Sequence, residues 1–302
     1  MFDLPATPPD SFAELRDALE QSARRRIDLP ADQKVVTIDG DAWPFGHKLA
    51  VTPTGGRVEV DAGTGGLPEH LKPPTLDSDR SEGPKFDRFE VRGEPLMIDV
   101  EGGGPLPLTI RVDGREVGFD FGRSRTGTWV MAPASGDVEA ELSVPREALL
   151  KVIEQKSKTE AAARGVKLTR LVAEVGSPSD QALRVVGRLE GSKKVAFFNA
   201  NFAIDFGIDL VAEPDRDGHL VGRVAELDLQ GDGPVMSVIL GLARSVIDKA
   251  KRTPLPLSDV LAMAGVQGLR VRDVRVTTGE TLTLHAELGD GNVAAGKDHA
   301  TA

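Results

Sequence analysis

Along one stretch of the chain every second residue is apolar. The row comprises Ala196, Phe198, Ala200, Phe202, Ile204, Phe206, Ile208, Leu210 and Ala212. Strict alternation of this kind predicts one β-strand with a fully apolar face. At about 3.3 Å per residue the strand would span roughly 55 Å, whereas a compact globule of this chain length is only about 50 Å across. The strand must curl, or the molecule is elongated.

Three further alternating segments flank this long strand, at about Lys167–Val175, Ala182–Glu190 and His219–Gln230. Their connections are short and rich in turn-forming residues, at 176–180 and 214–218. Short connections favour an antiparallel meander of four strands. Asp205 and Asp209 alternate with the apolar row, so we expect them on the solvated, polar face.

The region from Val35 to Leu142 alternates in shorter pieces, which predicts several more strands. Asp113-Gly114 separates two of these pieces and is typical of a hairpin turn. Gly63–Pro74 and Asp77–Lys85 are expected to be loops. Two last strands should hold the apolar residues of 269–276 and 282–288.

Three longer helices are predicted. Ser11 and Glu14 form a capping box for the first, which ends near Arg26, and the Arg24–Arg26 triplet would compensate its dipole. The second begins at Ser143, with Pro145 in its first turn, and ends near Gly165. The third opens at Gly233-Pro234 and carries a regular apolar stripe to Ala250. A short helix is expected over 258–264.

This order of elements predicts an α+β fold rather than parallel βαβ winding. The two later helices, end to end, match the length of the long strand, which favours a highly curved, elongated antiparallel sheet wrapped around long amphipathic helices. We divide the chain into an N-terminal segment and helix over 1–27, one elongated domain over 28–288, and a disordered tail over 289–302.

Composition narrows the function classes. The 302 residues carry a formal net charge of −10, which argues against nucleic acid as a partner. The absence of cysteine excludes disulfides, thiolate catalysis and cysteine-bound zinc. The N-terminus lacks a signal peptide, and no apolar run is long enough to span a bilayer. These features predict a soluble, cytoplasmic protein, or a cell-envelope protein if a precursor segment is missing.

The sequence offers no motif for catalysis or for a cofactor. It has no nucleophile elbow, since Gly122 to Gly127 around Ser124 has the wrong spacing, and no phosphate-binding glycine loop. The five histidines are far apart and predict no metal site. We therefore expect a non-enzymatic protein without cofactor or metal.

The phenylalanine row has two interpretations, a dry core or the lining of a ligand channel, and the length of the row favours a long acyl chain. The candidate lining residues come from the long strand and from the third helix. They are Phe198, Phe202, Ile204, Phe206, Ile208, Leu210, Val238, Ile239, Leu242 and Val246.

The chain also resembles the actinobacterial LmeA-type phospholipid-binding family, formerly a domain of unknown function. The likeness covers about 28–288 and rests on Glu141–Leu150, on the Pro-Leu-Pro-Leu stretch before Gly268–Thr277, on the closing strand Thr281–Leu288 and on Phe86–Val91. The resemblance implies a tubular lipid-binding fold that binds phospholipid or glycolipid in the envelope without catalysis.

Three hypotheses follow from the sequence. The first is binding, or transfer, of a phospholipid or another long-chain lipid in an apolar trough, with peripheral membrane contact as a further partner. The second is a structural or interaction module with a fully packed core and no ligand. The third is an enzyme acting on a lipid or glycan ester, with Ser124 or a distant carboxylate pair in its site.

Overall fold

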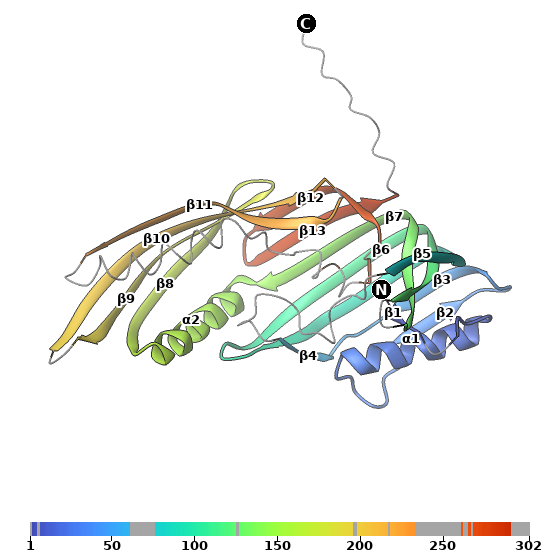
Figure 1. Ribbon diagram of the computed structural model, residues 1–302, viewed down its shortest axis with the longest axis horizontal. Coiled ribbons are helices and arrows are strands. Elements are labelled where there is room, and N and C mark those ends of the chain that lie inside the picture. The colour runs from blue at the N-terminus through green and yellow to red at the C-terminus, as the bar shows by residue number, and fades with distance from the viewer. Residues whose placement is uncertain are drawn as a thin grey trace, which may run out of the picture.

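The computed structural model describes residues 2–4, 7–60, 76–124, 127–195, 198–216, 218–232, 261, 265–266 and 268–290. Two β-sheets lie one after the other along the long axis (Figure 1). The larger sheet comprises β1 (Phe2–Asp3), β2 (Val36–Asp39), β3 (Phe45–Val51), β4 (Arg57–Val60), β5 (Leu76–Val100), β6 (Gly104–Ser124), β7 (Trp129–Pro145), β12 (Arg270–Thr278) and β13 (Thr281–Gly289). The smaller comprises β8 (Val166–Ser179), β9 (Ala182–Val195), β10 (Phe198–Pro214) and β11 (Leu220–Asp232).

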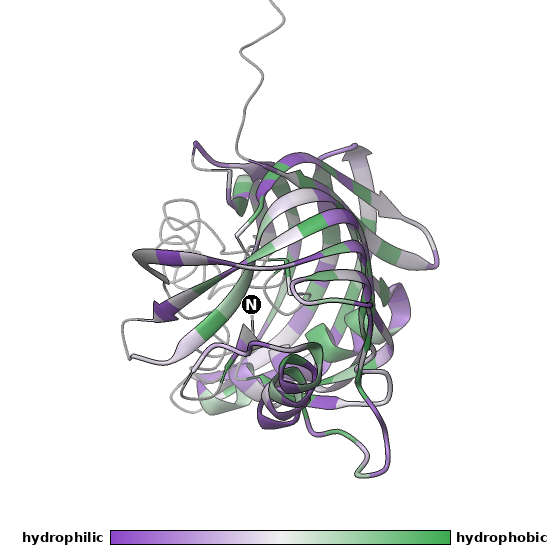
Figure 2. Cartoon of the chain, turned by 90° about the vertical axis from the view of Figure 1, so that its right-hand side faces the viewer, coloured by the Kyte–Doolittle hydropathy of each residue, from purple (hydrophilic) through white to green (hydrophobic). Residues whose placement is uncertain are grey.

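The larger sheet has the order β12-β13-β7-β6-β5-β3-β2, with β1 beside β7 and β4 beside β5. It is mostly antiparallel, but β3 and β4 both pair with β5 in parallel. The strands curve strongly around the interior, and hydrophobic and hydrophilic residues alternate along them (Figure 2). The sheet is open, since its path ends at β12 on one side and at β2 on the other.

The smaller sheet is the predicted antiparallel meander, in the order β11-β10-β9-β8. Its central strand β10 contains 17 residues and pairs with β9 without a register shift. The long alternating segment is therefore one strand, as predicted, although it begins at Phe198 and continues to Pro214. Opposite β10, β11 carries a bulge next to Asp209 and Leu210, which adds to the twist of the sheet.

Helix α1 (Phe12–Arg26) confirms the first predicted helix. Ser11 is its N-cap and accepts a hydrogen bond from the Glu14 N–H, while the Glu14 carboxylate accepts one from the Asp10 N–H. The arginines lie in the last turn, as dipole compensation requires. Arg26 also forms an ion pair with Asp3, 2.7 Å long, so the triplet has structural partners.

Helix α2 (Arg146–Ala163) joins the two sheets. It begins three residues later than predicted because β7 continues to Pro145, which is the N-cap. On one side it meets the turn before β6, where Lys156 and Thr159 donate hydrogen bonds to the carbonyls of Glu101 and Gly102. Its C-terminal end leads directly into β8.

The two sheets also meet at a second place, which we call the sheet junction. The amide of Val276 on β12 donates to the carbonyl of Asp180, and the amide of Val271 donates to that of Gly218. Asp180 and Gly218 belong to the turns that connect β8 with β9 and β10 with β11. Two turns of the smaller sheet are thus fixed to the edge of the larger one.

One apolar core runs from α1 through the larger sheet to the base of the smaller one. Phe86, Phe89 and Phe119 form its aromatic centre, with ring centroids 5.5 to 6.0 Å apart. Ala212 and Leu220 extend the same cluster into β10 and β11. The proposed division into 1–27, 28–288 and a tail stays a prediction.

Two predictions in the first half of the chain were wrong. Asp113-Gly114 is not a turn, because both residues pair with β5 on one side and with β7 on the other. Gly114 is needed for packing, since an ideal Cβ there would lie 2.7 Å from Cγ2 of Val117. The charged segment Asp77–Lys85 is not a loop either but belongs to β5, which is 25 residues long.

The predicted arrangement of helices is shown only in part. The fold is mainly β with an antiparallel-rich sheet, and the described residues do not show long amphipathic helices wrapped by it. The third predicted helix, the loop 63–74, nearly all of the short helix 258–264 and most of the tail lie outside the described residues.

Asp120 on β6 provides a test of the charge arrangement in the larger sheet. Burial raises its pKa above the ordinary value of 3.8, and Glu82, its cross-strand neighbour, raises it further against the opposite effect of Arg80 and Lys85. Because the folded carboxyl binds its proton more tightly than the unfolded one, its ionised form destabilises the fold, and stability rises as the pH falls through the raised pKa.

We therefore expect Asp120→Asn to raise the free energy of unfolding at pH 7, and the gain to vanish below the unfolded pKa. Urea denaturation at pH 7 and at a pH below the unfolded pKa measures the gain in stability and its loss. The matched control is Asp113→Asn on the same strand, which removes an ion pair with Arg92 and should give no gain. A loss of stability at pH 7 in the Asp120 variant would contradict this account.

Candidate functional site

The apolar row of β10 is the candidate site, and the structure places its described members on one face of the smaller sheet. Ile204, Phe206, Ile208 and Leu210 are half-buried, whereas Phe202 is buried, with 6% of its surface exposed. The side chain of Phe198 lies outside the described residues, and so do Val238, Ile239, Leu242 and Val246 of the predicted third helix.

Neighbouring strands continue this face in register. Ile208 lies between Val185 on β9 and Leu227 on β11, and Leu189 pairs with Ile204. Each of these neighbours is half-buried too. We call this surface the apolar face. It consists of Leu168, Leu171, Ala173, Val175, Leu183, Val185, Gly187, Leu189, Gly191, Phe202, Ile204, Phe206, Ile208, Leu210, Val224, Leu227 and Leu229.

Two glycines of β9 lie opposite the phenylalanines of β10. Gly191 pairs with Phe202 and Gly187 pairs with Phe206. An ideal Cβ would lie 2.7 Å from Cζ of Phe202 at Gly191, and 2.6 Å from Cζ of Phe206 at Gly187. The rings of Phe202 and Phe206 therefore lie across the neighbouring strand, over positions where only glycine leaves room.

The equivalent face of the larger sheet is closed. Ile110 and Val112 on β6, with Ala140 and Leu142 on β7, are all buried. Apolar rows of the two sheets thus have different environments in one molecule. The difference marks the apolar face of the smaller sheet, and not the sheet interior in general, as the candidate binding surface.

The opposite face of the smaller sheet is charged. Asp205 forms an ion pair of 3.0 Å with Arg188, and its side chain is 57% exposed, as predicted for a solvated face. Asp209 is different, because its side chain is only 18% exposed, 3.5 Å from Arg184, and its Oδ1 atom has no hydrogen-bond partner. The expectation of a solvated Asp209 was therefore wrong. Asp209 lies next to the bulge of β11.

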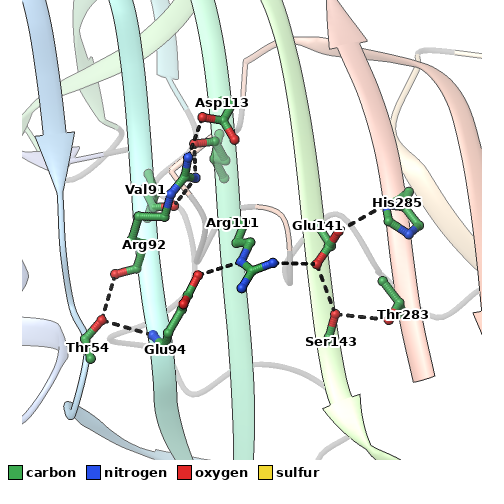
Figure 3. Close-up of polar contacts among 11 residues, drawn as sticks. Thr54, Val91, Arg92, Glu94, Arg111, Asp113, Glu141, Ser143, Thr283 and His285 are labelled. Carbon is green, nitrogen blue, oxygen red and sulfur yellow. Dashed lines mark hydrogen bonds and ion pairs between the residues drawn. The ribbon is translucent and has the colours of Figure 1, made fainter. Parts of the chain in front are cut away.

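A line of polar side chains crosses the larger sheet (Figure 3). Arg111 on β6 lies 2.5 Å from Glu94 on β5 and 3.8 Å from Glu141 on β7. The hydrogen bond from Arg111 lowers the pKa of Glu94, so this carboxylate stays ionised. These groups neutralise one another across the strands, which is typical of a solvated sheet face.

The same line ends on Ser143, Glu141 and His285, which are the residue types of a hydrolase triad. Glu141 lies between the other two, 3.4 Å from the Ser143 hydroxyl and 3.6 Å from Nδ1 of His285 (Figure 3). The serine contacts a carboxylate and Thr283 rather than the imidazole. In a hydrolase triad the imidazole lies between the hydroxyl and the carboxylate and takes the proton from the hydroxyl. Here the carboxylate of Glu141 occupies that middle position, so the three residues do not have the order of a triad.

Ser124, the other candidate nucleophile, has a structural position. It is buried, and its hydroxyl accepts a hydrogen bond from the Thr128 N–H. The Gly127 N–H donates to its carbonyl, so Ser124 closes the turn after β6. This geometry is that of a turn cap.

Sequence reasoning missed the two glycines of β9 that lie opposite the phenylalanines of β10. The alternation of Leu183, Val185, Gly187, Leu189 and Gly191 was a sufficient signal, because it places both glycines in line with the apolar residues.

Within the described part of the chain, no three His, Asp or Glu side chains are grouped so as to hold a metal ion. No described helix has the length and apolar character needed to cross a membrane. No protein-family model, curated protein or solved structure matches this chain.

Proposed function

We propose that the protein binds the acyl chains of phospholipid or glycolipid along the apolar face of the smaller sheet, without catalysis. The observation that carries the proposal is the half-burial of Ile204, Phe206, Ile208 and Leu210 along one strand of 17 residues. A long, narrow apolar surface suits a long, narrow apolar ligand, whereas compact ligands need only a few convergent side chains.

The chemistry of the apolar face supports a lipid over a polar ligand. The four residues of the β10 row and their neighbours Val185 and Leu227 carry no polar side-chain atom. The ion pairs of this sheet, such as those of Arg184 and Arg188, belong to the opposite face. A ligand on the apolar face is therefore recognised by contact area and length.

A second candidate is a structural module in which the apolar face is packed and binds nothing. The burial of Phe202 over Gly191 favours it, because that part of the row already has the environment of a core. The two candidates differ in what the half-buried residues contact, and a binding measurement separates them.

The test is uptake of fluorescent phosphatidylcholine by delipidated protein. We expect Ile208→Asp to weaken uptake about 5- to 150-fold, because an uncompensated polar group on an apolar surface costs about 1–3 kcal/mol. The matched control is Val186→Asp, which introduces the same side chain at an exposed valine of β9. Val186 lies opposite Gly207 on the charged face, so uptake should not change.

The proposal fails if the folded, delipidated protein takes up no phosphatidylcholine. It also fails if Ile208→Asp and Val186→Asp alter uptake equally. Circular dichroism of both variants shows whether the sheet is intact.

A further inference from the structure

The end of the smaller sheet that lies away from the sheet junction carries a group of lysines. Beyond the last pair of β11, at Asp232 and Ala203, only β8, β9 and β10 continue. Their last rows hold Lys167, Lys193 and Lys194. The other described residues of these rows are Val166, Ser192, Val195, Phe198, Asn199, Ala200 and Asn201, and none of them is a carboxylate.

Lys193 interrupts the apolar face. It pairs with Ala200 on one side and with Val166 on the other. Since side chains alternate along a strand, Lys193 projects to the same side as Gly191 and Leu189. The apolar face therefore ends at a lysine, and this residue is half-buried.

Lys167 and Lys194 have the other parity and lie on the charged face at the same end. Both are exposed. The end of the sheet thus presents cations on both of its faces.

These lysines differ from three of the arginines of the same sheet. Arg184, Arg188 and Arg223 each form an ion pair with a carboxylate of β10. Among the described residues, none of the three lysines has such a partner. In a chain with a net charge of −10, three uncompensated cations at one end constitute a local positive field that opposes the average charge.

We propose that this lysine end docks on an anionic phospholipid bilayer, and that Lys193 contacts the phosphate of the lipid whose chains lie on the apolar face. The second part rests on the proposed function. Cations next to an apolar surface match the two parts of a phospholipid, since the headgroup phosphate meets ammonium groups and the chains meet apolar side chains. The exposed lysines then contact neighbouring headgroups.

The test is co-sedimentation of the full chain with vesicles. One set contains phosphatidylcholine alone, and the other contains equal parts of phosphatidylcholine and phosphatidylglycerol. We expect binding only to the anionic set, and a decrease at high salt because exposed charges are screened. Each basic residue near an anionic surface strengthens binding about fivefold, so changing Lys167, Lys193 and Lys194 together to Gln should weaken it on the order of 100-fold.

The matched control removes three exposed cations elsewhere, by changing Lys34, Arg115 and Lys151 to Gln. It alters the net charge equally and should leave vesicle binding unchanged. Equal binding to both vesicle sets, or an equal loss in the two triple variants, would overturn the proposal. Displacement of the protein from vesicles by inorganic phosphate at low concentration would also overturn it, because the end would then be a site for the free ion.

Failure of the two proposals can be told apart. Ile208→Asp should lose uptake of phosphatidylcholine and still sediment with anionic vesicles. The double variant Lys167→Gln with Lys194→Gln leaves Lys193 in place, so it should lose sedimentation and still take up phosphatidylcholine. If Lys193→Gln alone leaves the preference for anionic over zwitterionic fluorescent lipid unchanged, Lys193 does not contact the phosphate.

Discussion

Phe89→Ala is expected to lower the free energy of unfolding by about 3–5 kcal/mol. Phe89 lies at the centre of the larger sheet with none of its surface exposed, and its ring packs edge-to-face on Phe119 at 5.5 Å. Its cross-strand neighbour is Gly114, which has no side chain that can move into the vacated space. The truncation therefore leaves a cavity, and urea denaturation measures its cost.

The matched control for Phe89→Ala is Phe45→Ala on β3. Phe45 is 65% exposed, so the same change should alter stability by no more than about 0.5 kcal/mol. If the two variants lost similar stability, the aromatic cluster of β5 and β6 would not be the centre of the core.

The second large effect concerns the pair Gly191 and Phe202. Gly191→Ala should cost about 1–3 kcal/mol, because the new Cβ would lie 2.7 Å from Cζ of Phe202 and 2.7 Å from the carbonyl oxygen of Lys167. Phe202→Ala should cost about 3 kcal/mol, because the ring is buried. With Phe202 shortened, part of the clash at Gly191 disappears.

The double variant should therefore be more stable than the sum of the single changes predicts, by at least about 0.5 kcal/mol. Free energies of unfolding of the two single variants and of the double variant complete the cycle. Strict additivity would show that the ring of Phe202 does not lie over Gly191. Gly207→Ala is a suitable control, since its Cβ would meet no atom closer than 3.9 Å.

The strands of the smaller sheet could be predicted because two local signals agree there. Alternation fixes the faces of β10, and the turn residues 176–180 and 214–218 fix where the chain reverses. The final hairpin of β12 and β13 followed from the same agreement. In these regions the neighbours of a strand in space are also its neighbours in sequence.

The larger sheet was harder because its pairs are less local. Asp113-Gly114 has the composition of a turn, but Gly114 is held between Phe89 and Val138 by strands on both sides. The parallel pairing of β3 with β5 places Leu49 beside Phe89, and no local pattern encodes such a register. Tertiary context overrode turn propensity in this sheet.

For the candidate site, the sequence identified the β10 row but not its surroundings. Period-2 alternation says which residues share a face, and it does not say how deeply each is buried. Phe202 and Phe206 have the same place in the pattern, yet only the first is buried. The position of Lys193 on the apolar face follows from the register between β9 and β10, which pairs Lys193 with Ala200.

The sheet junction has a consequence for the behaviour of the protein at high concentration. A free strand edge is a template on which strands of other molecules can assemble. On β12, the amides of Val271 and Val276 are already used by the turns at Gly218 and Asp180. The smaller sheet thereby shields this edge from intermolecular strand addition, and a molecule that lost these contacts would gain a surface prone to aggregation.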